Sequence, residues 1–182
     1  VRLVQQVIAP ADKVKQPAIR MGINTDIRAV DAIALGTSEV FPIEMVSAYS
    51  ALSNMGVYSK PFAITKIEDR YGNIIKEYYP DRKEVLSEET AYLMTSLMQT
   101  VMDRGTGGSA RWKYKFNRPA AGKTGTTQGW SDAWFVGFTP QIAAGCWFGV
   151  DNFKVPLGPG QDGSRAASVS YTHLTLPTIL SV

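Results

Sequence analysis

The residues best suited to chemistry are a lysine and three threonines set among glycines in the C-terminal half of the chain. They read Gly122-Lys123-Thr124-Gly125-Thr126-Thr127. In a strand, side chains alternate between faces, so Thr124 and Thr126 would point one way and Lys123 and Thr127 the other. Two hydroxyls on one face can bind a carboxylate, and a nearby ammonium adds positive charge. Gly125 leaves room for a second backbone, so such an edge strand could accept an extended peptide. An ordinary edge strand with a solvated lysine is the alternative that this run alone leaves open.

A phosphate-binding loop is a competing interpretation of the same region. Asn117–Thr124 nearly matches the pattern G-x-x-x-x-G-K-[ST], but asparagine replaces the first glycine. The loop also needs a helix after Thr124, whose first N–H groups would hold the phosphate. Gly125 and the β-branched pair Thr126-Thr127 follow instead, then an aromatic-rich run. These features favour a strand.

The context of this run resembles the transpeptidase domain of class A penicillin-binding proteins, bifunctional enzymes that polymerise and cross-link peptidoglycan. Lys-Thr-Gly is one of the three motifs of these enzymes and of serine β-lactamases, with Ser-x-x-Lys and Ser-Asp-Asn. The resemblance covers nearly all of residues 1–167. Its other segments, in the family's order, are Ala34–Val40 leading into Met45–Tyr49, Arg104–Gly107 and Asp132–Gly137.

The resemblance implies a partial penicillin-binding and serine β-lactamase-like transpeptidase fold. In the intact enzyme a serine attacks a terminal D-Ala-D-Ala stem peptide, D-alanine leaves, and an amine of a neighbouring stem takes the acyl group. Lys123 is then expected to supply charge beside the serine and to aid proton transfer. Thr124 and Thr126 are expected to bind the terminal carboxylate of the peptide or of a penicillin, on a substrate-binding strand that includes Gly125 and Thr127. The backbone N–H of Thr126 is expected to be one of the two oxyanion-hole donors. No metal or organic cofactor is implied.

Two motifs of the family are missing from the sequence. No serine is followed by lysine three positions later, and none by asparagine two positions later. In the family both motifs lie upstream, so we expect the chain to start after them and to be inactive alone. The only histidine, His173, lies after residue 167, so a Ser-His-Asp triad is excluded in residues 1–167. The only cysteine is Cys146, which excludes a cysteine-rich metal site. Apolar neighbours predict that Cys146 is simply a small buried side chain.

Two parts of the chain are expected. Residues 1–167 form a partial transpeptidase domain. Residues 168–182 resemble a translated sequencing adapter, and we expect this tail to make few core contacts and no long helix, because it carries no charge and Pro177 interrupts it.

The resemblance also implies partners and a location for the parent protein. Peptidoglycan stem peptides and β-lactam antibiotics are the expected ligands, at the extracytoplasmic face of the bacterial cytoplasmic membrane. A membrane anchor and a glycosyltransferase domain are expected only upstream. A serine β-lactamase or D,D-carboxypeptidase, or a β-lactam sensor, remains an alternative. The Thr126-Thr127 pair and Arg104–Gly107 favour the transpeptidase.

Composition is consistent with an ordinary folded domain. Of 182 residues, 45% are apolar and 19% charged, with a net charge of +3. No basic cluster indicates nucleic-acid binding, and no apolar run approaches the length of a membrane span.

The periodicity predicts an α+β fold in which an antiparallel sheet is packed by helices. Helices are expected at residues 1–8, 28–34, 42–55 and 87–104, and strands at 62–68, 73–79, 120–127, 133–138 and 142–151. The predicted buried faces of the two longest helices are Met45, Ala48, Tyr49, Leu52 and Met55, and Ala91, Met94, Met98 and Val101.

Overall fold

The computed structural model describes residues 11–152, 155–168, 170 and 172. The helix predicted for residues 1–8 lies outside them, as does most of the predicted tail. No helix in these described parts is both long and apolar enough to cross a membrane.

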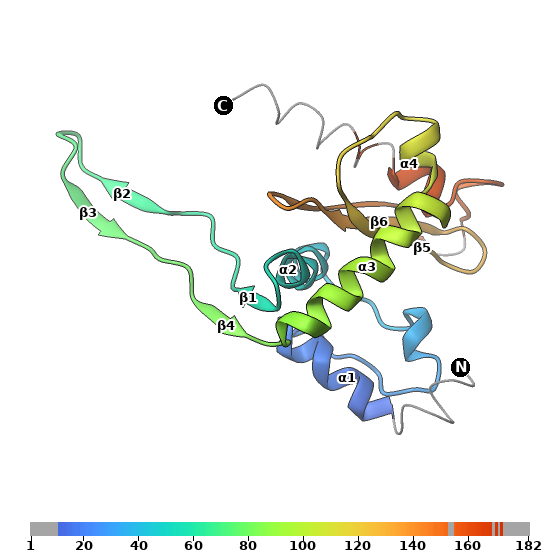
Figure 1. The fold of residues 1–182 in the computed structure, drawn as a ribbon, viewed down its shortest axis with the longest axis horizontal. Helices are drawn as coiled ribbons and strands as arrows, with labels where there is room; N and C mark the ends of the chain where they lie inside the picture. Colours follow the sequence, from blue (N-terminus) through green and yellow to red (C-terminus); the bar gives the residue numbers. More distant parts are fainter. Residues whose placement is uncertain (1–10, 153–154, 169, 171, 173–182) are drawn as a thin grey trace.

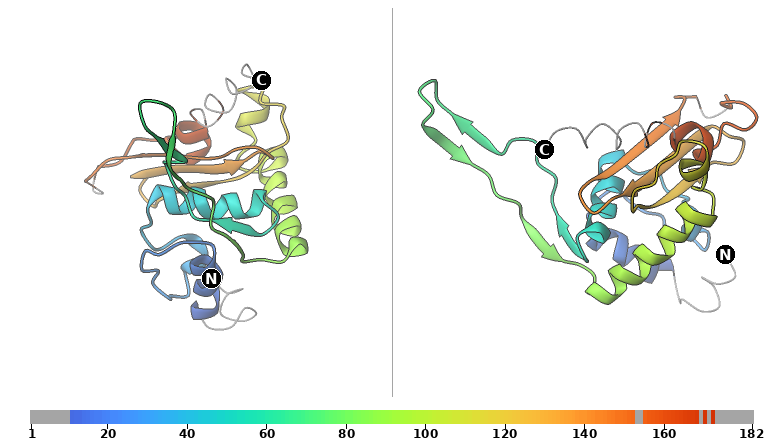
Figure 2. Two further views of the ribbon diagram at one scale, coloured as in Figure 1. Left: turned by 90° about the vertical axis from the view of Figure 1, so that its left-hand side faces the viewer. Right: turned by 45° about the horizontal axis from the view of Figure 1, so that its top comes forward.

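A three-stranded antiparallel sheet is the centre of the fold (Figure 1). Its strands are β5 (Ala121–Thr126), β6 (Asp132–Phe138) and β7 (Ala143–Gly149), in the order β5-β6-β7. Helix α2 (Pro42–Ser53) covers one face, and the short π-helix η3 (Gly163–Ala167) covers the other (Figure 2). Helix α3 (Glu88–Arg104) packs along β5, and α4 (Ser109–Trp112) lies against η3. The predicted α+β fold, its three C-terminal strands and its two long helices are confirmed.

Helix α2 begins at Pro42 as predicted and ends at Ser53, two residues before the predicted end. Pro42 occupies its first turn, where a missing N–H costs nothing, and Gly56 adopts a φ of +92° just after the end. Met55, predicted to be buried, is 46% exposed because it lies beyond the last helical residue. The helix is covered on two sides, so small residues on a second face, Ser47 and Ala51, are also buried.

Helix α3 starts where the predicted helix over residues 87–104 begins, with Ser87 as its N-cap: the Ser87 hydroxyl accepts a hydrogen bond from the N–H of Thr90 at 3.3 Å. Its buried face is narrower than predicted and consists of Ala91, Met98 and Met102. Met94 is 41% exposed. At 3.6 residues per turn it points about 60° away from Ala91, to one side of the face that packs against β5 and α2.

An arm of two pairs of strands projects from the body (Figure 1). At its base β1 (Val57–Ser59) pairs with β4 (Arg82–Glu84), and further out β2 (Lys66–Glu68) pairs with β3 (Ile74–Glu77). The strands expected at residues 62–68 and 73–79 both form, are shorter than expected, and pair antiparallel. Asp69 forms the turn between them by accepting hydrogen bonds from the N–H groups of Tyr71 at 2.7 Å and Asn73 at 2.9 Å.

The prediction of a helix over residues 28–34 is wrong. Only a turn of 3-10 helix, η2 (Ile33–Leu35), forms there. The N–H of Arg28 donates to the Ser38 hydroxyl at 2.9 Å, which ties the backbone across the loop rather than along a helix. Helix α1 (Ala11–Arg20) was not predicted, and Pro17 inside it explains why.

The predicted tail is described at three positions. Ser168, Ser170 and Thr172 are helical, and Ser168 and Thr172 are fully buried. The Ser109 hydroxyl lies 3.3 Å from that of Ser168. Ser168 and Thr172 depart from the expectation of few core contacts. The other tail positions except Ser170 lie outside the described residues, so the origin of the tail stays a prediction.

Glu44 ties the loop after α1 to the first turn of α2. Its carboxylate accepts hydrogen bonds from the N–H groups of Asn24 at 3.0 Å and Thr25 at 3.2 Å, and from the Thr25 hydroxyl at 2.5 Å. Burial raises the pKa of Glu44, but the hydrogen bonds from Thr25 and Asn24 outweigh burial, so the pKa lies below its ordinary value of 4.5.

Asp132 and Trp147 tie the start of β6 to β7. The indole N–H of Trp147 donates to the Asp132 carboxylate at 2.8 Å. The Asp132 side chain is buried, and the Ser131 hydroxyl also donates to it at 3.3 Å. Gly149 completes the arrangement, because a Cβ there would lie 2.5 Å from the Asp132 carboxylate.

We predict that Glu44→Gln destabilises the chain by about 1 kcal/mol at pH 7, because a neutral amide accepts these hydrogen bonds more weakly. The depressed pKa means that the stabilisation is present above pH 4.5 and is lost as the pH falls through the lower, folded-state pKa. Urea unfolding of the two proteins at several pH values measures the difference. The exposed Glu39→Gln is the matched control, and an equal effect in both variants would show that the hydrogen bonds of Glu44 do not matter.

We also predict a coupling of roughly 1–2 kcal/mol between Asp132 and Trp147, because removing either partner leaves the other without its hydrogen bond. A double-mutant cycle of Asp132→Ala and Trp147→Phe, followed by urea unfolding, measures it. Strictly additive losses would mean that the bond contributes nothing to stability.

Candidate functional site

The predicted site residues lie on β5, which is an edge strand of the sheet. Lys123, Thr124, Gly125 and Thr126 belong to the strand, and Thr127 follows it. Only β6 pairs with β5 in the part of the chain that the structure describes. The register sets Thr124 opposite Phe135 and Thr126 opposite Ala133.

Two hydrogen bonds at the strand turns fix which way the backbone of β5 points. The N–H of Thr127 donates to the carbonyl of Asp132 at 3.1 Å, and that of Thr139 to the carbonyl of Ile142 at 2.8 Å. Hydrogen-bonded pairs alternate with non-bonded pairs in an antiparallel ladder. Counting back from Thr127, the N–H and C=O groups of Thr124 and Thr126 therefore point away from β6, toward the outer edge.

The side chain of Lys123 curls around this edge. It is exposed, and its ammonium donates to the outward-pointing carbonyl of Thr124 at 2.7 Å. Within residues 11–152 and the described C-terminal positions, no carboxylate forms an ion pair with it. The positive charge is therefore free to attract an anion to the edge.

The two threonines share a face, as predicted, but have different partners. The hydroxyl of Thr124 lies 2.6 Å from that of Thr106, in the turn after α3. The hydroxyl of Thr126 accepts from the N–H of Gly163, at the start of η3, at 3.1 Å. Thr127 belongs to the β5–β6 turn, where its hydroxyl accepts from the N–H of Asp132 at 2.8 Å.

Gly125 lies where a second backbone does come close. A Cβ on Gly163 would stand 2.5 Å from the carbonyl oxygen of Gly125 and 2.3 Å from that of Trp134. The start of η3 is held in this position by Asp162, whose carboxylate accepts from the N–H groups of Ser164 at 2.9 Å and Arg165 at 3.1 Å. Glycine at position 163 is thus required for η3 to reach the strand.

Two residues of the site were not assigned a role from the sequence. Thr106 belongs to Arg104–Gly107, which resembles the family but suggested no chemical role, and Gly163 carries no side chain. Both reach β5 through contacts between distant parts of the chain, which residue spacing does not reveal.

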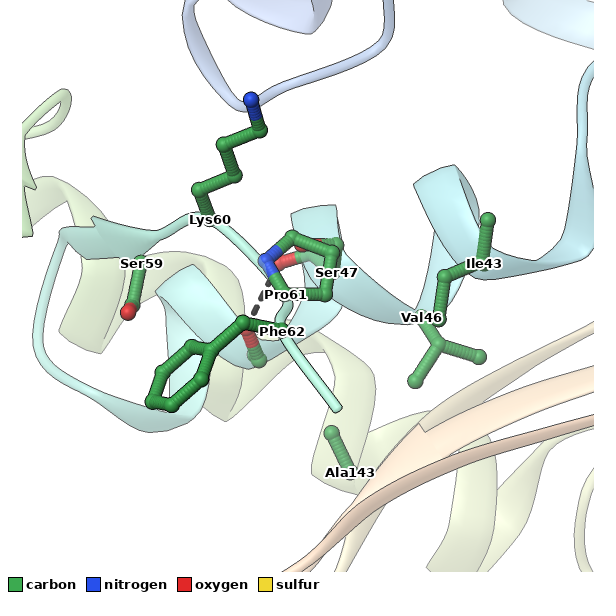
Figure 3. A pocket seen from close by; sticks show the side chains of 9 residues that line it. Ile43, Val46, Ser47, Ser59, Lys60, Pro61, Phe62 and Ala143 are labelled. Atoms are coloured by element: carbon green, nitrogen blue, oxygen red, sulfur yellow. Dashed lines mark hydrogen bonds between the residues drawn. The ribbon is translucent and has the colours of Figure 1, made fainter. Parts of the chain in front are cut away.

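A shallow hollow elsewhere does not share this chemistry (Figure 3). It lies between α2, the segment after β1 and the start of β7, two strands away from β5. Of the described residues that line it, only Lys60 is charged, and its side chain extends away from Phe62 and Ala143. Across the described ranges, no three His, Cys, Asp or Glu side chains gather in a way that could hold a metal ion.

The arrangement can hold an extended peptide that ends in a carboxylate. An added strand would find outward N–H and C=O groups on β5, an ammonium for its charge and hydroxyls on one face. The outward N–H of Thr126 could in addition stabilise a developing oxyanion.

A family model and the similar proteins all point to the same family. Residues 9–172 match the family described as "Penicillin binding protein transpeptidase domain", a match that runs past the expected boundary at residue 167. Penicillin-binding protein 1A of Aquifex aeolicus is 42% identical over 136 residues, which are 75% of this chain and 18% of that protein. Penicillin-binding protein 2D of Bacillus subtilis is 36% identical over 145 residues, 77% of this chain and 21% of that protein. The chain thus spans about a fifth of the length of these relatives.

Solved structures agree. The 2.6 Å crystal structure of penicillin-binding protein 1A from Haemophilus influenzae has a TM-score of 0.88 and 26% identity, over 99% of this chain and 32% of that one. PonA1 from Mycobacterium tuberculosis, at 22% identity, shares the fold with a TM-score of 0.82, over 100% of this chain and 53% of its own. The resemblance found in the sequence is confirmed, and the chain belongs to the penicillin-binding protein transpeptidase domain family.

Proposed function

We propose that this chain forms the Lys-Thr-Gly wall of the active site of a peptidoglycan D,D-transpeptidase. The enzyme cross-links D-Ala-D-Ala stem peptides through a serine acyl-enzyme, and its nucleophilic serine comes from outside these 182 residues. The observation that carries the proposal is the outward N–H of Thr126 on a strand edge that no described strand covers, beside the ammonium of Lys123, which forms no ion pair with any described carboxylate.

The edge of β5 suits the peptide substrate. A stem peptide laid alongside it would pair with the outward backbone groups of Thr124 and Thr126, as an added strand. Its terminal carboxylate would lie near the threonine hydroxyls and the ammonium of Lys123, which together supply charge-assisted hydrogen bonds. This pairing fixes the scissile carbonyl relative to the strand.

The acylation step follows from that placement. Attack by the serine turns the scissile carbonyl into an oxyanion, and the N–H of Thr126 donates to it. One such donor is worth roughly 10²–10³ in rate. Lys123 stabilises the negative charge. Collapse of the oxyanion breaks the C–N bond, and Lys123 assists transfer of the serine's proton to the nitrogen of the leaving D-alanine. An amine of a second stem then takes the acyl group.

The same edge would bind penicillins, whose carboxylate and strained amide occupy the positions of the peptide's terminus. PonA1, which shares the fold, has been solved in complex with penicillin V. Relatives named as penicillin-binding proteins also favour this reading over a β-lactamase. We place the parent enzyme at the extracytoplasmic face of the cytoplasmic membrane, with its anchor and a glycosyltransferase domain in other segments.

The 182-residue chain alone should not be labelled by a fluorescent penicillin, because it has no Ser-x-x-Lys motif. A chimera in which residues 9–172 replace the matching segment of the Aquifex aeolicus relative should be labelled at one serine. Gel fluorescence and peptide mass spectrometry measure both. Stoichiometric labelling of the chain alone would refute the assignment of the nucleophile.

In that chimera, Lys123→Gln should lower the rate constant of penicillin acylation roughly tenfold or more, because charge-assisted hydrogen bonds are worth about 1.5–3 kcal/mol. Stopped-flow fluorescence measures the rate constant. Lys83→Gln, on the projecting arm, removes the same charge far from β5 and should leave it unchanged. Equal rate constants in all three proteins would leave Lys123 an ordinary surface lysine.

A further inference from the structure

Thr106 is tied to the active-site strand by one short contact. Its hydroxyl lies 2.6 Å from that of Thr124, and the two residues are 18 positions apart in the sequence. Thr106 is exposed and Thr124 half-buried. The pair therefore lies at the surface, where the turn after α3 meets β5.

The turn that carries Thr106 is closely wound. The N–H groups of Gly105 at 3.1 Å and Gly107 at 3.0 Å both donate to the carbonyl of Val101, the last turn of α3. The N–H of Gly108 donates back to the carbonyl of Gly105 at 3.0 Å. A Cβ on Gly105 would come within 2.8 Å of the Cα of Val101. These contacts fix the conformation of the turn that carries Thr106, and α3 itself packs along β5.

The hydroxyl of Thr126 shows how such a group can be prepared for an anion. A backbone N–H can only donate, so the Thr126 oxygen accepts from Gly163 and its own proton is left to point elsewhere. Thr124 lies on the same face two residues earlier, and a carboxylate bound there can only accept. Thr124 can offer its proton to that carboxylate only if Thr106 supplies the proton of the hydrogen bond between them.

We propose that Thr106 is a positioning residue of the carboxylate subsite. Its hydroxyl donates to Thr124, which directs the Thr124 proton toward the terminal carboxylate of a stem peptide or β-lactam and polarises that donor. This inference rests on the proposed function and adds a third threonine to it. Without Thr106, the Thr124 hydroxyl is free to rotate and to donate elsewhere.

The test uses the chimera described above, with penicillin G and its methyl ester as probes. Thr106→Val removes the hydroxyl and keeps the shape. It should slow acylation by penicillin G roughly three- to tenfold, the worth of one net hydrogen bond, and hardly change acylation by the ester. Thr106→Ser keeps the hydroxyl and should restore the rate. Thr100→Val, which removes an exposed hydroxyl of α3 bonded to Ser96, is the control and should change neither rate.

Three outcomes would overturn the inference. An equal loss with penicillin G and its ester would show that Thr106 supports the fold of the turn and not the carboxylate. If Thr106→Val is acylated by penicillin G at the unchanged rate and Thr124→Val more slowly, Thr106 has no role in the carboxylate subsite, and the proposed function still stands. If Thr124→Val also reacts at the full rate, the carboxylate subsite itself is wrong, and the proposed function fails with it.

Discussion

The register of the antiparallel ladder is the constraint on which the site depends. The hydrogen bonds at the turns 127–132 and 139–142 set the pairing of β5, β6 and β7 from both ends, and they agree with each other. A slip of one residue would turn the N–H of Thr126 inward and bring that of Gly125 to the edge. It would also move the threonine hydroxyls to the opposite face. The chemistry proposed for the edge of β5 therefore requires this register.

The surrounding elements hold that strand in place from several directions. The start of η3 approaches so closely that only glycine fits at position 163. The network of Thr127, Ser131 and Asp132, with Trp147 bonded to it, fixes the turn that leads into β6. Beneath them, Phe116, Phe135 and Met102 are fully buried and join α3, the segment before β5 and the sheet. Each of these contacts comes from a different part of the chain, so the site is a product of the whole fold.

Much of this could be predicted from the sequence, where local signals are strong. The expected starts of the two long helices, at residues 42 and 87, agree with the structure to within one residue, and the periodicity predicted the three C-terminal strands. The shared face of Thr124 and Thr126 followed from the alternation of side chains along a strand. Prediction failed where contacts between distant parts of the chain determine the local structure or the site residues. Arg28 bonds to Ser38 instead of forming a helix, Pro17 conceals α1, and Thr106 and Gly163 become site residues only when the turn after α3 and η3 reach β5.

The outward orientation of the β5 backbone is the central claim, and amide hydrogen exchange of the 182-residue chain, resolved by NMR, tests it most directly. The N–H groups of Lys123 and Gly125 point to β6 and should exchange slowly, while those of Thr124 and Thr126 point to the edge and should exchange fast. An alternation of slow and fast rates in that order is the predicted result. Protection of Thr126 equal to that of Gly125, or the reverse alternation, would contradict the account.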